Sequence, residues 1–365
     1  MSKQNPAYQP YETYDLFGTP ISISIGDFEV PKLLSLSLKN SMQQFVDTIE
    51  MTFANPFNCM GKVVKLGDPI TAIYRSETYQ SAPQAFGVIT LLEGILEYYN
   101  SSKTSESQLT LAGRHKILNF TEQDFSPPRQ FKDTTDNAII TEALKGWDGE
   151  FNLDPPVQIK QEDATPGTSR AALAERAANA TGHHLYVVGR TVFKKKTTKK
   201  AGDSQYTLYE SYDPEKNNVL DVQPSIDISR ARKKISGYQS AVSGSSQRKI
   251  QQTTDTDLEI KTFKNKYTIN RDLEVSVELP AKDNTQAELV LEREKAKVEP
   301  SEKIKIWVQN WILFDLNSVI HLESEFHGIS GEFVVFERIF SLTKEGSIVT
   351  EITVVPLGRD FIDTN

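Results

Sequence analysis

The chain has 365 residues, which is more than a single ordinary core accommodates and suggests about two to four domains. Hydrophobic residues make up 38% of the sequence and charged residues 25%, a composition typical of a folded, strand-rich protein and not of a globally disordered one. The net charge of −8 and the pI of about 5.4 disfavour a generally basic nucleic-acid-binding protein but leave room for a local basic patch.

The N-terminal segment, residues 1–19, is rich in aromatic residues and carries Pro6 and Pro10. We interpret it as an extended arm that docks on a neighbour, although a floppy terminus has the same composition. The sequence has neither an apolar core of signal-peptide length nor the roughly 18 consecutive apolar residues that span a bilayer. We therefore expect a chain without a membrane-spanning segment that is made in the cytoplasm.

From Pro20 onward, apolar and polar residues alternate in ISISIGDFEV, LLSLSLKNS and FVDTIEMTF. This period of two is typical of strands with one buried face. A hairpin pattern follows in FGVITLLEGILEYYNSSKTSESQLTLAG, residues 86–113. Together with the turn signals between them, these strands predict a small antiparallel barrel or sandwich, so that residues 1–112 form the arm and a first β-barrel.

At Gly113 the pattern changes, and residues 113–212 predict an α+β domain. The Asp/Thr cluster at residues 133–136 is a helix N-cap signal before NAIITEALKGW. RAALAERAANATG predicts an alanine-rich helix that ends at Gly182. The run Lys194–Lys200 then either contacts nucleic acid or an acidic surface, or lies in a solvated loop between strands at 185–193 and 206–209. We favour the loop, because no aromatic residue alternates with the lysines.

Residues 213–258 and 312–365 predict a second β-barrel, which residues 259–311 interrupt as a small inserted α+β domain. VLDVQPSIDIS and ARKKISGYQSAVSG predict a strand pair, and NTQAELVLEREKAKVEP predicts a helix with Pro300 just beyond its end. The closing segment EFHGISGEFVVFERIFSLTKEGSIVTEITVVP, residues 325–356, predicts a hairpin of the same shape as residues 86–113. The expected fold class is therefore α+β, mainly β, with two antiparallel barrels and two smaller mixed domains.

The sequence contains none of the common catalytic motifs, neither a nucleophile elbow nor a phosphate-binding loop nor an H-E-x-x-H pair. The single cysteine, Cys59, cannot form an internal disulfide, and no Cys/His cluster has zinc spacing. The acidic group Asp124, Asp133, Asp136 and Glu142 is better explained by turns and helix capping than by glycosidase chemistry. We therefore expect no catalytic, cofactor or metal site and no enzyme activity.

The C-terminal tail, LFDLNSVIHLESEFHGISGEFVVFERIFSLTKEGSIVTEITVVPLGRDF, resembles the end of baseplate hub proteins of contractile-tailed phages. These are the late-control-protein-D-like hubs, which are related to the hub part of type VI secretion spike proteins. The domain order is similar along nearly the whole chain, and Phe314-Asp315-Leu316 replaces the aromatic-Pro-Gly turn that is frequent in the family. The residues that carry the resemblance are Gly113, Arg114, Leu316, Asn317, Ser318, Val319, Ile320, Gly328, Ile329, Phe333, Val334, Val335, Gly346 and Pro356.

The resemblance implies a homotrimer in which each subunit gives two barrels to a pseudo-sixfold ring. Such a ring adapts a sixfold tail tube, or its initiator protein, to a threefold central spike, contacts the baseplate wedge proteins, and lies in the virion tail. DNA passes through its lumen without specific binding, and an acidic lumen favours that passage. We expect the two hairpins to supply the contacts between subunits or with the tube. The predicted contact residues are Phe86, Val88, Phe333, Val335, Ile348 and Glu351.

Two other functions remain open at this point. A tail-associated cell-wall hydrolase needs a paired acid or a Cys/His site, and neither mixed domain contains one. A carbohydrate- or protein-binding β module of other origin needs no oligomer, so a stable monomer favours it.

Overall fold

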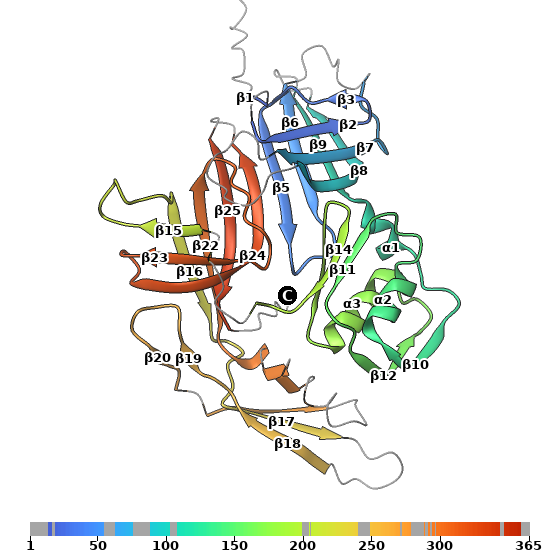
Figure 1. The fold of residues 1–365 in the computed structure, drawn as a ribbon, viewed down its shortest axis with the longest axis vertical. Helices are drawn as coiled ribbons and strands as arrows, with labels where there is room; N and C mark the ends of the chain where they lie inside the picture. Colours follow the sequence, from blue (N-terminus) through green and yellow to red (C-terminus); the bar gives the residue numbers. More distant parts are fainter. Residues whose placement is uncertain are drawn as a thin grey trace, which may run out of the picture.

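The computed structural model describes residues 14–16, 19–54, 63–75, 88–102, 108–198, 204, 206–239, 249–270, 272–278, 288, 291–292, 294–295, 297–343 and 347–358. In these ranges the protein is mainly β, as predicted, and a large curved sheet forms its centre (Figure 1). A mixed unit with the helices lies on one side of this sheet, and a small β unit extends from one end.

The N-terminal part of the large sheet is built from strands whose buried and exposed residues alternate. In β2, for example, Ile21, Ile23 and Ile25 are buried while the serines between them are half-exposed. This alternation is the pattern that identified the strands in the sequence. The strands are β2 (Ile21–Ile25), β3 (Phe28–Glu29), β5 (Ser35–Ser41), β6 (Thr48–Ala54), β7 (Pro69–Arg75), β8 (Val88–Ser102) and β9 (Gln108–His115). Beside them, β1 (Tyr14–Asp15) and β4 (Lys32–Leu33) pair with each other in a separate two-stranded sheet.

The C-terminal part of the same sheet ends in the second predicted hairpin. Both predicted hairpins are confirmed, because β8 pairs antiparallel with β9 and β24 pairs antiparallel with β25. The turn predicted at residues 344–346 lies outside the described residues. The strands are β15 (Tyr206–Glu210), β16 (Asp221–Asp227), β22 (Ser301–Gln309), β23 (Val319–Ser324), β24 (Ile329–Leu342) and β25 (Ile348–Pro356).

The prediction of two separate barrels is not confirmed. The described strands of the two parts form one open sheet of order β16-β22-β25-β24-β5-β6-β9-β8-β7-β2-β3, with β23 and β15 continuing from β24. None of the sheets in the described ranges closes on itself. The physical reason is that alternation determines which face of a strand is buried but not which strand is its neighbour. Strand β24 pairs with β5, about 300 residues earlier in the chain, instead of closing a local barrel.

The mixed unit packs two helices against short strands between residues 116 and 195. The strand predicted at 206–209 in the same domain pairs instead in the large sheet, as β15. Helix α2 begins after Thr135, whose side chain accepts a hydrogen bond from the Ala138 N–H, and α3 begins after Ser169 in the same way. The elements are a 3-10 helix (Lys116–Leu118), α1 (Asn119–Glu122), β10 (Arg129–Thr135), α2 (Asp136–Ala143), β11 (Glu150–Leu153), β12 (Gln158–Ala164), α3 (Arg170–Ala180), β13 (His184–Val188) and β14 (Thr191–Lys195).

The expectation that the run Lys194–Lys200 is a solvated loop is wrong for its first residue, Lys194. Strand β14 extends to Lys195, and the Lys194 side chain is fully buried. Its Nζ donates to Asp136 Oδ2 at 2.8 Å and to the Pro155 carbonyl at 3.2 Å. A buried carboxylate needs such a partner, so the first lysine of the run belongs to the core of the mixed unit. Lys199 and Lys200 lie outside the described residues.

The small β unit is inserted between β16 and β22. The predicted pairing of residues 219–229 with residues 231–244 is wrong, because β16 pairs with β22 while β17 pairs with β18 and β21. The buried Glu302 carboxylate accepts hydrogen bonds from the Lys261 and Thr262 N–H groups and so fastens the insert to the large sheet. The described strands are β17 (Lys234–Gln239), β18 (Lys249–Asp255), β19 (Glu259–Ile260), β20 (Tyr267–Thr268) and β21 (Glu274–Glu278). The division of the chain into domains remains a prediction.

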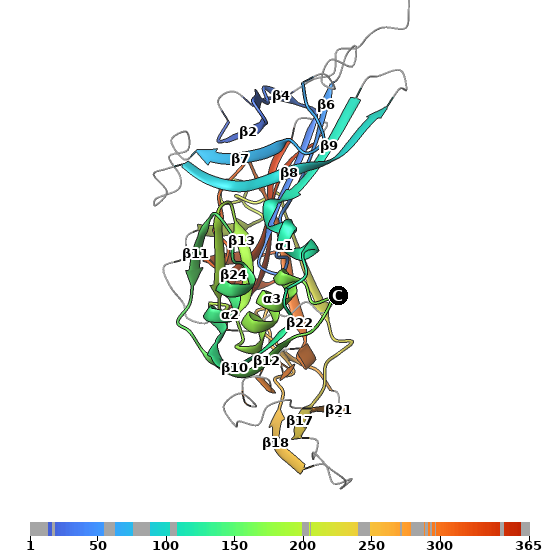
Figure 2. The ribbon, with the colours of Figure 1, turned by 90° about the vertical axis from the view of Figure 1, so that its right-hand side faces the viewer.

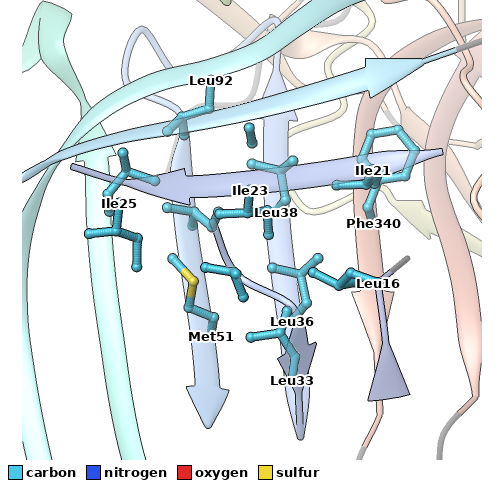
Figure 3. Close-up of a cluster of buried hydrophobic side chains, with 14 of the residues drawn as sticks. Leu16, Ile21, Ile23, Ile25, Leu33, Leu36, Leu38, Met51, Leu92 and Phe340 are labelled. Carbon is cyan, nitrogen blue, oxygen red and sulfur yellow. The ribbon is translucent and has the colours of Figure 1, made fainter. Parts of the chain in front are cut away.

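The largest hydrophobic core lies where β2 and β7 cross over β5, β6 and β9. Figure 3 shows side chains from both layers meeting there, together with Phe340 from β24. Trp311 and Leu313, which follow β22, enter the same core. The two parts of the sheet therefore share their hydrophobic interior as well as their backbone hydrogen bonds.

His115 joins the sheet to the mixed unit. Its Nδ1 accepts a hydrogen bond from the Ile117 N–H at 3.1 Å, and its Nε2 lies 2.6 Å from the Gly189 carbonyl oxygen. These contacts suit a neutral ring with the proton on Nε2, because a proton on Nδ1 would face an N–H group. Burial accordingly lowers the pKa of His115 to about 4.

We expect the contribution of neutral His115 to stability to decrease as the pH falls from 7 to 5. An unfolded histidine takes up its proton near pH 6.5, whereas folded His115 does not until about pH 4, so the unfolded state binds more protons in between. The His115 contribution to the free energy of unfolding should decrease by about 2 kcal/mol over this interval. Urea denaturation of the wild type and of His115→Asn checks this. The free energy of unfolding of the wild type minus that of His115→Asn should fall by about 2 kcal/mol from pH 7 to pH 5. The same difference for His321→Asn, on a half-exposed histidine, should stay constant, and a constant difference for both variants would contradict the prediction.

Candidate assembly interface

The two parts of the large sheet repeat one strand order. In the N-terminal part the strands β2, β5, β6, β7, β8 and β9 lie in the order β5-β6-β9-β8-β7-β2. In the C-terminal part β15, β16, β22, β23, β24 and β25 lie in the order β16-β22-β25-β24-β23-β15, which is the same arrangement of first to sixth strand. The one difference is that β15 pairs parallel to β23, whereas β2 pairs antiparallel to β7. We call these two sets of strands the N-terminal and C-terminal repeats.

Each repeat contains a β-bulge at the corresponding place, which allows the two repeats to be aligned residue by residue. The register shifts between Leu96 and Tyr98 in β8 and between Val335 and Glu337 in β24. When the bulges are superposed, the strand registers make Leu38 of β5 equivalent to Pro224 of β16. The alignment also reproduces burial, since Leu36 and its equivalent Val222 are both buried. Bulges re-aim strands, so their matching positions indicate that both hairpins bend at the same place.

Beyond its bulge, β24 no longer pairs with β23, and β8 no longer pairs with β7. The segment of β24 from Glu337 to Leu342 has β25 on one side and β5 on the other. We call this pairing of β24 with β5 the internal seam. Its register places Arg338 opposite Asn40, and the Met42 N–H donates to the Phe336 carbonyl at 3.0 Å. That bond makes Ser41 and Glu337 a pair without mutual hydrogen bonds, and Ser37 and Ser341, four residues on, are a pair of the same kind.

Polar groups are buried in the internal seam. The fully buried Arg338 guanidinium donates from Nε to Asn40 Oδ1 at 3.1 Å and from Nη1 to the Phe314 carbonyl at 2.8 Å. Asn40 Nδ2 in turn donates to Asp47 Oδ2 at 2.6 Å. Burial raises the pKa of Asp47 to about 8, although Asn40 and the positive charge of Arg338 act in the opposite direction. On the exposed face, Lys39 and Glu337 form an ion pair at 2.7 Å.

Two strand edges, which correspond to the two sides of the internal seam, have no partner strand among the described residues. Residues 98–102 of β8, which correspond to the seam segment of β24, pair with β9 alone. Strand β16, which corresponds to β5, pairs with β22 alone. We call these two segments the open edges. Large hydrophobic side chains are exposed at both, with Tyr98 50%, Leu220 54% and Ile228 41% accessible. Such side chains on an unpaired edge favour contact with another chain.

Strand β16 offers few hydrogen-bond donors on its open edge. The Val222 N–H donates to the Asp221 side chain at 3.0 Å, and Pro224, two residues on, has no N–H. Alternate N–H groups of a strand point to the same side, so both positions face away from β22. A proline or a self-satisfied N–H on an edge limits indiscriminate pairing. The edge therefore accepts a partner strand mainly through its carbonyl groups.

The residues predicted as contacts do not gather at the open edges. Phe86 lies outside the described residues, and Val88 begins β8 at the end remote from the open segment. Phe333 and Val335 are buried in the core of their own chain. Ile348 and Glu351 lie on β25 inside the sheet, where Glu351 pairs with Lys305 at 2.8 Å. Their roles in contacts with other chains remain predictions.

The sequence analysis missed the open edges. The signal for β16 was Pro224, because a proline inside an alternating segment marks an edge strand. No comparable signal in the sequence marks residues 98–102 of β8.

A pocket of about 490 Å³ lies at the ends of β15 and β23 and bears on the hydrolase alternative. Its Glu325 carboxylate accepts hydrogen bonds from the Tyr212 N–H and the Ser211 hydroxyl, which lower its pKa. A glycosidase acid needs a raised pKa, so Glu325 is unsuited to that role. Across the described ranges, no group of His, Cys, Asp and Glu side chains has the arrangement of a metal site, and no helix is long and apolar enough to cross a membrane.

Solved structures share this fold across nearly the whole chain. A tail protein from Neisseria meningitidis superposes with a TM-score of 0.71 at 13% identity, covering 93% of this chain and 97% of that one. The 43 kDa tail protein of prophage MuSo2 from Shewanella oneidensis gives 0.71 at 13% identity, covering 93% and 98%. A type VI secretion component of Escherichia coli, which has structural similarity to bacteriophage T4 tail proteins, gives 0.52 at 10% identity, covering 94% and 79%. Neither a family model nor a curated protein sequence matches the chain.

Proposed function

We infer a function for the chain from its fold, which it shares with phage tail proteins and a type VI secretion component, in agreement with the resemblance drawn from its sequence. On this premise we propose that it is a structural baseplate hub without enzyme activity, located in the virion tail. Three copies form a pseudo-sixfold ring in which each copy contributes its two repeats. The ring adapts a sixfold tail tube, or its initiator protein, to a threefold spike and contacts the surrounding wedge proteins.

The internal seam is the observation that carries this proposal. Within one chain, β24 of the C-terminal repeat pairs with β5 of the N-terminal repeat. The equivalent surfaces of the same repeats, residues 98–102 of β8 and strand β16, are the open edges. If β8 of one copy pairs with β16 of the next, the same junction recurs around the ring, and three copies close the sheet. A closed ring leaves no unpaired edge and does not grow into a filament.

The register of the proposed contact follows from the alignment of the repeats. Glu337 and Ser41 of the internal seam correspond to Tyr98 and Asp227, and Ser341 and Ser37 correspond to Ser102 and Gln223. Tyr98 and Ile228, both exposed in the single chain, are then covered by the neighbouring copy. The barrels predicted from the sequence thus become one barrel shared by three chains.

The polar face of this sheet suits the lumen of a DNA conduit. Several of its charged side chains form ion pairs, among them Lys39–Glu337 at 2.7 Å and Lys305–Glu351 at 2.8 Å. Arg114 and Glu97 form a third pair. A face whose basic groups are already paired offers few free cations to phosphate, so DNA can slide along it without specific binding.

A disulfide across the proposed contact tests the ring. In a Cys59→Ala background, Ser102→Cys with Gln223→Cys should give covalent trimers of three times 41.1 kDa on a non-reducing denaturing gel. In one chain, six strands lie between β16 and β8 in the sheet, so a cross-link between these positions reports contact between chains. The matched control, Ser37→Cys with Ser341→Cys, bridges the internal seam and should remain a monomer on the same gel.

Either of two results would count against the proposal. A ladder that continues beyond the trimer would show an open filament, and a stable monomer by native mass spectrometry at micromolar concentration would exclude the ring. Clear lysis in a peptidoglycan zymogram by the purified protein would restore the hydrolase alternative.

A further inference from the structure

Because the two repeats are alike, a strand of one copy can pair with the wrong edge while the ring forms. The seam segments of β24 and β8 are equivalent, and so are their partners β5 and β16. While chains fold and assemble, β24 of one copy therefore meets two similar edges, β5 of its own chain and β16 of another. Pairing with the wrong edge exchanges segments between chains and prevents the ring from closing.

We propose that Arg338, Asn40 and Asp47, together with the Lys39–Glu337 pair, are a recognition device that makes β24 accept β5 and reject β16 of another copy. We call these five residues the seam lock. The inference rests on the proposed ring for its biological meaning, but its chemistry is a property of the single chain. It assigns a specificity role to buried polar groups that the sheet does not need for its hydrogen bonding.

The correct pairing satisfies every member of the lock. Arg338 donates to Asn40 at 3.1 Å, and Asn40 donates to Asp47 at 2.6 Å. Asp47 Oδ1 also accepts from the Ser41 N–H at 3.2 Å, which ties the group to the backbone of β5. On the opposite face, Lys39 neutralises Glu337.

The wrong pairing leaves the lock unsatisfied at both faces. In the register of the repeats, Ile226 of β16 stands where Asn40 stands in β5, so the Arg338 guanidinium would lose its side-chain acceptor. Asp227, which has Arg230 and Lys303 nearby, would stand opposite Glu337, and Ser225 would replace Lys39. Two carboxylates would then face each other, and Glu337 would lose its Lys39 partner. A buried charge without its partner and a pair of like charges both select against the competitor. The expected discrimination is about 100-fold or more.

The proposed contact between β8 of one chain and β16 of the next has no such lock. Tyr99 of β8 and Ile226 of β16 occupy the positions of Arg338 and Asn40. No charge is required at this junction, so the ring can close without burying an ion. The chain thus distinguishes its own seam from the seam with a neighbour by charge alone.

Two sets of variants test the lock by refolding from denaturant in a Cys59→Ala background. The reporter is Ser341→Cys with Gln223→Cys, because these positions face each other only if β24 pairs with β16 of another chain. Within one chain, β22 and β25 separate the two strands. With the lock intact, we expect disulfide-linked dimers to be a minor product.

Removal of the lock with Arg338→Met and Asn40→Leu should raise the cross-linked fraction about tenfold or more. Grafting lock residues of β5 onto β16, which leaves the internal seam untouched, should also raise the cross-linked fraction. Ser225→Lys, Ile226→Asn and Asp227→Ser give the β16 edge the residues of β5. Ser225 and Asp227 are exposed and Ile226 is only partly buried, so the graft should fold. The control, Glu150→Ser, removes an exposed charge on β11 of the mixed unit, outside the lock and away from β16, and should leave the fraction unchanged.

The outcomes separate this inference from the proposed ring. If the graft refolds with the wild-type fraction of cross-linked chains, the lock does not discriminate, whatever the ring experiment shows. If the Arg338→Met, Asn40→Leu protein does not fold, the graft alone decides. A failure of the Ser102–Gln223 trimer with a positive graft would overturn the ring and leave the lock standing.

Discussion

Replacing Lys194 by methionine is expected to lower the free energy of unfolding by about 3–5 kcal/mol. The substitution keeps the apolar stem but removes the only lysine that contacts the buried Asp136 carboxylate among the described residues. Burial by itself raises the pKa of Asp136, and the hydrogen bonds from Lys194, the Val157 N–H and Thr181 outweigh it and hold that pKa below its usual value. Without the ammonium group, an uncompensated charge remains in the core. Urea denaturation at pH 7 measures the loss.

The pH dependence of this loss gives the experiment its specificity. As the pH falls, Asp136 in the Lys194→Met protein can take up a proton and become neutral, so the deficit relative to the wild type should shrink. Lys195→Met is the matched control: Lys195 is the next residue of β14, partly exposed and paired with Asp154 at 2.9 Å. Its loss should stay within about 1 kcal/mol. Equal losses for the two variants at pH 7 would mean that the buried Lys194–Asp136 pair contributes no more to the free energy of unfolding than the partly exposed Lys195–Asp154 pair.

Replacing Trp311 by alanine is expected to cost about 3–5 kcal/mol of stability and to affect both repeats at once. Trp311 is almost completely buried in the core of the N-terminal repeat although it follows β22 of the C-terminal repeat. Its Nε1 donates to the Ser341 carbonyl at 3.0 Å, and its own carbonyl accepts from the Tyr74 hydroxyl at 3.3 Å. The alanine variant loses the packed ring and leaves the Ser341 carbonyl without this donor.

Chemical denaturation followed by tryptophan fluorescence and by far-ultraviolet circular dichroism checks this prediction. The wild type should show coincident transitions, whereas the variant should unfold earlier and with separated transitions because the shared core is broken. Trp307→Ala is the control, since Trp307 lies on β22 four residues earlier and is only half-buried. A Trp307→Ala loss as large as that of Trp311→Ala would contradict the role assigned to the shared core.

Local elements of this fold were predictable because their signals are local. The alternation of Ile21, Ile23 and Ile25 identifies the buried face of β2 without any knowledge of its partners. The start of α2 follows from a hydroxyl at Thr135 that caps the first turn. Both hairpins were predictable because their strands are adjacent in the sequence and only a turn separates them.

The candidate interface could not be predicted, because it depends on contacts between distant residues. Arg338 and Asn40 are 298 residues apart, and nothing in either strand identifies the other as its neighbour. The same holds for Lys194, which belongs to a conspicuous lysine run and is explained only by Asp136, 58 residues earlier. A strand edge is defined by the absence of a neighbour, so the open edges become visible only when all other pairings are known.

The inserted β unit has a consequence for engineering. The chain leaves the large sheet at Asp227 and returns at Ser301, and these two residues are direct partners in adjacent antiparallel strands. The pairing of β16 with β22 therefore requires only that the two ends of the connecting segment lie side by side, as they do in a two-residue hairpin. The buried Glu302 carboxylate also requires the N–H groups of Lys261 and Thr262, so a replacement keeps these two residues. The site between β16 and β22 is a natural attachment point for foreign domains with neighbouring termini, and the length of such a cargo adds little to the entropy of closing the connection.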